Sequence, residues 1–240
     1  MSTYKVHFKG SEQIADGTMA FHFEKPGGFD FKAGQAIDLV LRAPAVNDVL
    51  PARHTFSIVS APHENGLTIA TRMRDSPFKQ AMSALAVGAE VELEGAFGSL
   101  TLHNDRKRTA IMIAGGIGIT PFVSILRQAA KEQLTQSFVL IYSNRRPQDA
   151  AFLAELQALE EGMASFQLIA TMTQIGQSKQ AWSGPTGQID TSLLTHVTAS
   201  RLAAIYYLAG PPLFVEAMQD LLNETGVEDD NIRSEGFYGY

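Results

Sequence analysis

The stretch IMIAGGIGITP, residues 111–121, is an apolar run that breaks into three glycines and then a Thr-Pro pair. Residues 111–114 predict a short buried strand, because the run is bounded by turn residues and is too short for a helix. Gly115, Gly116 and Gly118 allow the backbone to turn sharply and to approach a ligand closely. Thr120 is a good N-cap and Pro121 a good first residue for a helix over about 121–131. Strand, glycine turn and helix N-terminus together predict an anion site, suited to the pyrophosphate of a dinucleotide.

The spacing of these glycines departs from the Rossmann pattern. Gly116-x-Gly118 is followed by Pro121 where the G-x-G-x-x-G rule requires a third glycine. Glycines at a strand-to-helix corner can also serve packing alone, so the loop by itself leaves both interpretations open.

Length and composition narrow the class of protein. The chain has 240 residues, 45% of them hydrophobic and 18% charged, which predicts a folded protein with one large or two ordinary domains. Its formal net charge of −6 argues against general nucleic-acid binding. Without cysteine there is no disulfide, no thiolate nucleophile and no cysteine-ligated iron–sulfur cluster. The six histidines show no metal-ligand spacing, so we expect no metal site.

The sequence gives no sign of insertion into a membrane. The longest apolar stretch, near residues 110–119, is too short and too glycine-rich to span a bilayer. The polar start MSTYK does not resemble a signal peptide. We therefore expect a cytoplasmic protein without a transmembrane segment.

In the first part of the chain, apolar residues alternate in short runs that glycine and proline separate. Such alternation predicts about six antiparallel strands in a small barrel or sandwich over residues 1–104. One helix is expected over 76–85, with Ser76 as N-cap and Pro77 as the first helical residue. The strand runs are Tyr4-Val6-Phe8, Met19-Phe21-Phe23, Ile37-Leu39-Leu41, Phe56-Ile58, Leu67-Ile69 and Val91-Leu93.

After the charged junction NDRKR, residues 104–108, the pattern changes to alternating strands and helices. Apolar runs at 109–114, 138–142, 166–171, 205–208 and 232–237 are separated by helical stretches near 121–132, 149–161, 191–196 and 212–225. This alternation predicts a second, α/β domain over 105–240 with a parallel, doubly wound sheet. Ligands are expected at the carboxyl ends of its strands.

Four motifs, in this order, resemble those of the ferredoxin–NADP reductase family: FKAGQ at 31–35, HTFS at 54–57, EGAFG at 94–98 and GGIGITP at 115–121. The resemblance implies two domains, an N-terminal FAD-binding antiparallel β-barrel and a C-terminal NAD(P)-binding α/β domain. The family's flavin-binding Arg is His54 here, with Arg53 one position early. A His-x-Phe form also occurs in the NADPH oxidase and ferric reductase branch, so it stays open whether Arg53 or His54 touches the flavin.

For the first domain, the resemblance implies cofactor-binding roles. Phe56 would pack on the isoalloxazine, although core packing is an ordinary role for such a residue. Ser57 would hydrogen-bond near flavin N5, and Arg72 with Ser76 would hold the FAD pyrophosphate. The flavin residues so expected are Arg53, His54, Thr55, Phe56, Ser57, Arg72 and Ser76.

For the second domain, the glycine loop with Thr120 and Pro121 would hold the pyrophosphate of NAD(P)H. Ser143, Arg145 and Arg146 follow the second strand of this domain with no acid before Asp149, which favours NADPH over NADH. NADH remains an alternative, since arginines on a loop are often merely solvated.

The last two motifs concern the nicotinamide. Residues 209–212, AGPP, resemble the family's C-G-P-P, so Gly210 and Pro211 would bind the coenzyme and Ala209 replaces the usual Cys. Glu235 and Phe237 match the family's Glu-x-aromatic ending, which makes them catalytic candidates beside Ser57. Tyr240 is the alternative to Phe237 for covering the flavin, and a frayed tail is a further one.

The resemblance implies an FAD-dependent NAD(P)H oxidoreductase that passes hydride to FAD and electrons to a separate acceptor, a ferredoxin or flavodoxin. Three alternatives stay open: a reductase of free flavin, ferric chelates or quinones, an electron-transfer or sensory subunit of a larger complex, and a nucleotide-binding protein without flavin. Basic groups at Arg42, Arg53 and 106–108 are expected to receive an acidic protein partner.

Overall fold

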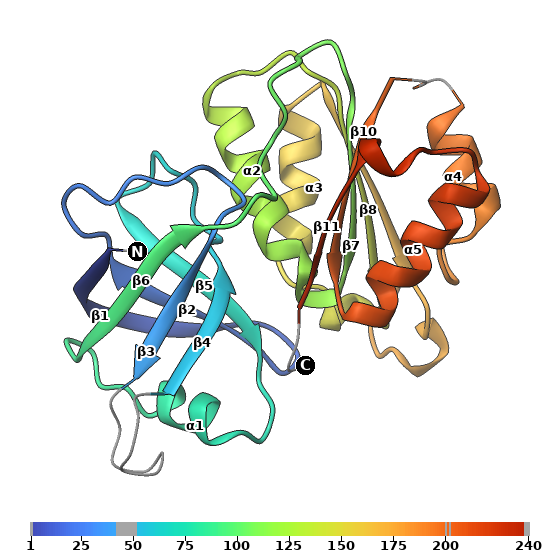
Figure 1. Cartoon of the computed structure of the whole chain (residues 1–240). Coiled ribbons are helices and arrows are strands. Elements are labelled where there is room, and N and C mark those ends of the chain that lie inside the picture. Colours follow the sequence, from blue (N-terminus) through green and yellow to red (C-terminus); the bar gives the residue numbers. More distant parts are fainter. Residues whose placement is uncertain (1, 42–51, 200, 202, 238–240) are drawn as a thin grey trace.

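The computed structural model describes residues 2–41, 52–199, 201 and 203–237 of the chain. They form two domains side by side, one built on an antiparallel sheet and one on a parallel sheet with helices on both faces (Figure 1). This arrangement confirms the predicted two-domain fold. The predicted boundary at 104/105 falls between the last strand of the first sheet and the first strand of the second, and it stays a prediction.

The first domain is a six-stranded antiparallel sheet in the order β4-β3-β6-β1-β2-β5. An isolated bridge between Ile58, just after β4, and Ile69 of β5 brings the two edge strands together, as in a barrel. The six predicted strands are confirmed. Their bounds are β1 Thr3–Ala15, β2 Thr18–Glu24, β3 Ala36–Leu41, β4 Ala52–Ser57, β5 Gly66–Arg72 and β6 Glu90–Phe97.

Helix α1, Pro77–Ser83, follows β5 and begins as predicted. The Ser76 hydroxyl accepts a hydrogen bond from the backbone N–H of Lys79 at 3.2 Å, which is the N-cap interaction, and Pro77 opens the helix. The helix ends two residues before the predicted Leu85, with Ala84 as its C-cap.

The second domain is a five-stranded parallel sheet in the order β11-β10-β7-β8-β9. The chain starts at the central β7, runs outward through β8 and β9, and returns to β10 on the other side, so the switch point lies between β7 and β10. The predicted alternation is confirmed. The bounds are β7 Ala110–Gly115, α2 Thr120–Lys131, β8 Phe138–Asn144, α3 Leu153–Gly162, β9 Phe166–Met172, α4 Thr191–Thr198, β10 Ile205–Gly210, α5 Pro212–Glu224 and β11 Ile232–Gly236.

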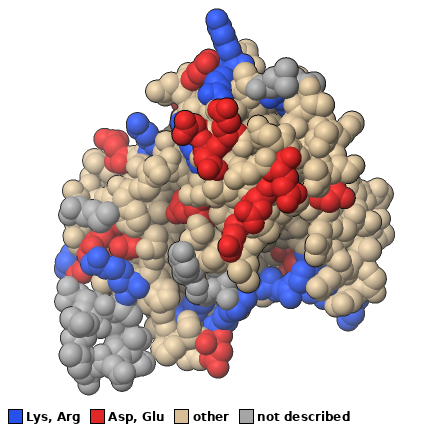
Figure 2. Space-filling model, turned by 45° about the vertical axis from the view of Figure 1, so that its right-hand side comes forward, with Lys and Arg blue, Asp and Glu red and all other residues tan. Residues whose placement is uncertain are grey.

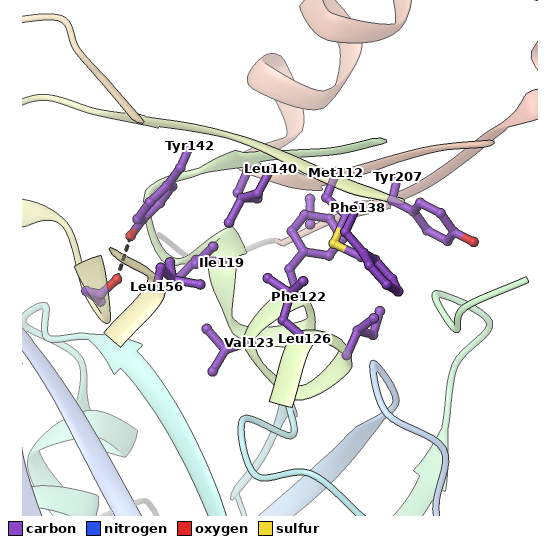
Figure 3. Close-up of a cluster of buried hydrophobic side chains, with 14 of the residues drawn as sticks. Met112, Ile119, Phe122, Val123, Leu126, Phe138, Leu140, Tyr142, Leu156 and Tyr207 are labelled. Atoms are coloured by element: carbon purple, nitrogen blue, oxygen red, sulfur yellow. Dashed lines mark hydrogen bonds between the residues drawn. The ribbon is translucent and has the colours of Figure 1, made fainter. Parts of the chain in front are cut away.

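The strands of this sheet are apolar on both faces because helices cover both. On one face Phe122 and Leu126 of α2 pack beneath Met112 and Leu140 of the sheet (Figure 3). On the other face α4 and α5 cover the sheet through residues such as Leu194 and Met218.

The two domains are packed together and do not merely share a linker. The cluster beneath α2 includes Val59 and Ala70 of the first domain. The buried Ser124 hydroxyl of α2 donates to the Ser60 carbonyl at 2.8 Å, and Arg127 pairs with Glu64 across the interface at 3.4 Å. These contacts hold the first domain against α2 of the second.

Candidate functional site

The glycine stretch after β7 is a short 3₁₀ helix, Gly116–Ile119, that runs directly into α2. Thr120 is therefore the first residue of α2 rather than its N-cap, and that part of the prediction is wrong. The cap position belongs to Ile119, because the 3₁₀ turn already has helical backbone angles. The Thr120 hydroxyl instead donates to the carbonyl of Ile117 at 3.1 Å.

The glycines of this loop have different physical reasons to be glycine. A Cβ atom at Gly118 would lie 2.2 Å from the carbonyl oxygen of Ala209, so packing of the loop on β10 excludes any side chain there. Gly116 has a φ of +54° and no atom near the place of a Cβ. Packing thus explains Gly118, whereas Gly116 leaves open backbone at the strand end, as an approaching ligand requires.

A pocket of about 310 Å³ opens at the carboxyl ends of β7 and β8. Both domains contribute to it, because Arg72 and Arg74 of the first domain lie opposite Ser143 and Arg145 of the second. Its wall is made by Arg72, Arg74, Gly115, Gly116, Ile117, Ser143, Asn144, Arg145, Asp149, Thr173, Pro211 and Phe214. Five expected coenzyme residues meet here: Gly115, Gly116, Ser143, Arg145 and Pro211.

Arg146 does not line this pocket. Its guanidinium donates two hydrogen bonds to the Asp149 carboxylate, both 2.8 Å long, and approaches Asp16 of the first domain at 3.9 Å. The bidentate bond lowers the pKa of Asp149. The acid nearest to the strand end is therefore already neutralised, and the cation beside it is occupied.

The pocket carries excess positive charge. Burial lowers the pKa of the Arg72 guanidinium, and the positive charge of Arg145 lowers it further. The side-chain amide nitrogen of Asn144 is buried with no hydrogen-bond partner among the described residues. The arginines of the pocket wall and the Asn144 N–H groups left unpaired within the described residues lie at one place, and together they fit an anionic ligand.

Arg53 and His54 are neighbours in β4, and their side chains lie on opposite faces of the strand. Arg53 pairs with Glu94 at 2.7 Å and with Asp38 at 3.6 Å, and the Thr55 hydroxyl also donates to Asp38. His54 faces the other way and stacks on Phe78 of α1, with ring centroids 4.2 Å apart. Alternation along the strand therefore turns His54 toward α1, and among the described residues His54, unlike Arg53, has no ion pair with an acid.

Of the expected flavin residues on β4, Phe56 and Ser57 are buried, whereas His54 and Thr55 are exposed. Phe56 lies in the core of the first domain with its ring 6.1 Å from that of Phe78, as the core-packing alternative requires. The hydroxyl of Ser57 is buried without a hydrogen-bond partner in the described part of the chain. Such an orphan group is costly unless a ligand satisfies it, so this end of β4 fits a polar cofactor atom.

Sequence reasoning missed Lys79. This residue of α1 is only 4% exposed, and its ammonium donates to the Arg72 carbonyl at 2.7 Å. Burial lowers the pKa of Lys79, and the pKa of His54 is lowered by burial and by the charge of Lys79. Lys79 lies three residues before the buried Met82, so helical periodicity was the available signal.

The end of the chain lies against β10. Glu235 pairs with Ala209 in the register of β11 and β10, and the N–H of Phe237 donates to the carbonyl of Gly210 at 2.9 Å. Burial raises the pKa of Glu235. Tyr240, the alternative to Phe237, lies outside the described residues.

The expected basic docking groups are mostly engaged within the chain. Besides Arg53, Arg108 donates to the carbonyls of Ala203 and Ala204 and to the side chain of Asn231. Arg106 donates to Gln136 at 3.3 Å, and Arg42 is outside the described residues. Among the described residues, no helix is both long and apolar enough to cross a bilayer, and no three acidic, cysteine or histidine side chains gather as a metal site would require.

Comparison with known proteins agrees with this geometry. Residues 112–220 match the model of the oxidoreductase NAD-binding domain. The reductase component of propane 2-monooxygenase from Mycolicibacterium goodii is 28% identical over 218 residues, which cover 89% of this chain and 61% of the relative. The chain thus spans about three fifths of the length of the curated relatives it matches.

Solved structures give the fold over the whole chain. A ferredoxin–NADP⁺ reductase from Neisseria gonorrhoeae with bound FAD and NADP superposes with a TM-score of 0.82 at 22% identity, covering 98% of both chains. A flavohemoglobin from Malassezia yamatoensis with bound FAD and heme gives 0.83 at 23% identity, covering 99% of this chain and 60% of its own. The chain as a whole therefore has the two-domain fold that is seen in the ferredoxin–NADP⁺ reductase structure.

Proposed function

We propose that this chain is an FAD-dependent NAD(P)H reductase that passes electrons to a separate acceptor. The observation that carries the proposal is the cationic pocket that both domains build at the strand ends of the parallel sheet. Such a pocket suits a coenzyme phosphate, and its position between the domains brings that coenzyme to the first domain.

We assign the FAD site to the side of β4 that faces α1. Phe56 would lie against the isoalloxazine, and His54 and Lys79 with Arg72 would hold the FAD phosphates. Ser57, whose hydroxyl has no partner among the described residues, would donate it to the flavin ring. When bound, FAD takes a hydride from the nicotinamide and hands its electrons on, and this chemistry belongs to the cofactor. The protein supplies the positive charges of Arg72 and Lys79, the Ser57 hydroxyl and the apolar surface of Phe56.

We assign NADPH as the preferred coenzyme and NADH as the alternative. Arg145 has no ion pair among the described residues and lies in the pocket wall with Ser143, a pair that suits a 2′-phosphate. Asp149, the nearest acid, is bound by Arg146 and is not free to accept a ribose hydroxyl.

At the nicotinamide end, Gly210 lies beneath the ring of Phe214, and Phe237 would cover the flavin. Burial raises the pKa of the Glu235 carboxyl in this half-buried place. We place Glu235 beside the coenzyme, because it lies opposite Ala209 at this strand end, and Phe237 as the side chain that would exclude water.

The acceptor is proposed to be another protein. Relatives matched by this chain are reductase components of propane 2-monooxygenase and terephthalate 1,2-dioxygenase, and an oxygenase component, a ferredoxin or a flavodoxin would all accept single electrons. A reductase of free flavin, ferric chelates or quinones is the alternative. A cytoplasmic location also remains a prediction.

The absorbance spectrum of the purified protein, with FAD added, tests the proposal. We expect flavin bands that bleach under anaerobic conditions, faster with NADPH than with NADH. Faster bleaching with NADH would reverse the coenzyme assignment alone. Failure to take up FAD would overturn the reductase function. Where FAD binds, steady-state turnover with ferredoxin, compared with ferricyanide and with free flavin, distinguishes a protein acceptor from a small one.

A further inference from the structure

The ring of Phe214 lies over the crevice at the switch point of the parallel sheet. Phe214 belongs to the first turn of α5, which begins just after Gly210 and Pro211. A Cβ atom added to Gly115, at the end of β7, would lie 2.8 Å from the ring atoms Cγ and Cδ1. One added to Gly210, at the end of β10, would also lie 2.8 Å from Cδ1. The ring therefore rests directly on the backbone of both strand ends.

This crevice is the path left for the second half of a dinucleotide. A ligand of an open α/β sheet crosses the strand ends at the switch point, which here lies between β7 and β10. The cationic pocket, about 310 Å³, is at the small end for a ligand site, and Phe214 with Pro211 forms its wall on the β10 side. A coenzyme whose phosphates bind at Arg145 must extend over Gly210 toward Phe237, through the place of the ring.

We infer that Phe214 is a positioning residue whose ring occupies the place of the nicotinamide half in the coenzyme-free protein and sets how tightly that half binds. This inference rests on the proposed function. Phe214 is partly exposed and faces the pocket, and a phenyl ring holds no hydrogen bond that rotation would break. Displacing it costs its contacts with the two glycines and with the apolar cluster between the sheet and α5. Part of the coenzyme's binding free energy is therefore used to open the crevice.

Isothermal titration with a whole coenzyme and with a fragment tests this role without any enzymatic turnover. NADP⁺ carries the nicotinamide half, whereas 2′,5′-ADP lacks it and binds only at the phosphate pocket; NAD⁺ and ADP form the equivalent pair if NADH is the coenzyme. Phe214→Ala is expected to bind NADP⁺ about fivefold more tightly, which corresponds to about 1 kcal/mol. Its affinity for 2′,5′-ADP should stay within about twofold of the original.

Leu213→Ala is the matched control, because this neighbour is also in the first turn of α5 but is 79% exposed. It should change neither affinity. Phe214→Leu keeps apolar bulk on the glycines and should give an intermediate gain for NADP⁺, with thermal unfolding checking that both variants fold. Weaker binding of NADP⁺ to Phe214→Ala, or equal changes for both ligands, would overturn the inference. If the unchanged protein binds neither ligand, the coenzyme site itself fails, and the inference with it.

Discussion

At the scale of the single residue, Ser57 separates a structural role from a functional one. Its hydroxyl is buried and has no partner among the described residues, which costs free energy in the cofactor-free protein. A side chain kept for stability alone would find a partner or be apolar. The orphan hydroxyl is thus the residue-scale argument for a cofactor at β4.

Ser57→Ala should have opposite effects on stability and on electron transfer. Without FAD, the variant should be as stable as the original or more stable by about 1 kcal/mol, because it removes an unsatisfied buried group. With FAD, the rate of anaerobic flavin bleaching by NADPH should fall, by about tenfold or more, since the hydroxyl no longer orients the reacting ring. Thermal unfolding and stopped-flow absorbance measure the two effects. Ser99→Ala is the control, and loss of stability with unchanged bleaching would contradict the cofactor role.

Arg145 and Arg146 are adjacent in sequence but should behave differently. Arg145→Gln removes a cation from the pocket wall and should raise the KM for NADPH about tenfold or more while leaving that for NADH nearly unchanged. Arg146→Gln breaks the bidentate bond to Asp149 and should act on stability instead. Steady-state kinetics with both coenzymes, beside thermal unfolding, distinguishes them. Equal effects of the two variants on the KM for NADPH would contradict this assignment.

The sequence supplies the residue types at the site but not all of their partners. Asp149 follows Arg146 at a spacing of three, yet only the structure shows the bidentate bond that withdraws both from the pocket. Strand alternation already places Arg53 and His54 on opposite faces, but which face meets α1 depends on the tertiary fold. Arg74 follows the expected phosphate ligand Arg72 by two residues, whereas nothing in the local sequence marks the Asn144 amide as buried and without a partner among the described residues.

At the scale of the element, the strands and helices follow from period and punctuation. Runs in which apolar and polar residues alternate predict the antiparallel strands, and the alternation of strands with helices predicts the parallel sheet. The glycine loop was harder, because a 3₁₀ turn over 116–119 moves the start of α2 to Thr120 and leaves no cap to find. Glycine has no propensity that distinguishes such a turn from an open loop, so contacts with β10 decide it.

Gly118→Ala should disrupt this element. The added methyl would lie 2.2 Å from the Ala209 carbonyl oxygen, so the loop and β10 must move apart. We expect a loss of about 2 kcal/mol in the free energy of unfolding together with weaker NADP⁺ binding. Gly162→Ala at the end of α3 is the matched control, since nothing lies near the place of its Cβ. Thermal unfolding and titration calorimetry measure both, and unchanged stability of Gly118→Ala would refute the packing argument.

At the scale of the whole molecule, charge is unevenly distributed. Exposed acids of α5, Glu216, Asp220 and Glu224, follow each other at intervals of four on one side of the helix. Acidic side chains form a diagonal row on the face that Figure 2 shows. The cations of the pocket lie instead at the domain interface, so a chain of net charge −6 still offers a local site for an anion.

A buried histidine also holds the segment that links the two domains in place. His103, in the segment between β6 and β7, is 7% exposed, and its Nδ1 lies 2.7 Å from the hydroxyl of Tyr207 in β10. Its Nε2 lies 2.8 Å from the amide nitrogen of Gln136 and 3.1 Å from the carbonyl oxygen of Arg108. Burial accordingly lowers the pKa of His103 below its ordinary value of 6.5.

Stability should therefore decline as the solution becomes acidic. Because the pKa of His103 is lower in the folded chain than in the unfolded one, the unfolded chain binds a proton first as the pH falls below about 6.5. The stabilising contribution of the neutral ring is fully present above that pH and is lost as the pH falls toward the folded pKa. Urea unfolding should be measured at room temperature at about pH 7.5, 6.5 and 5.5. The free energy of unfolding should change less with pH for His103→Gln than for the unchanged protein. His196→Gln, which removes an exposed imidazole from α4, is the control. Equal slopes for the original protein and His103→Gln would mean that the buried histidine does not couple the domain link to pH.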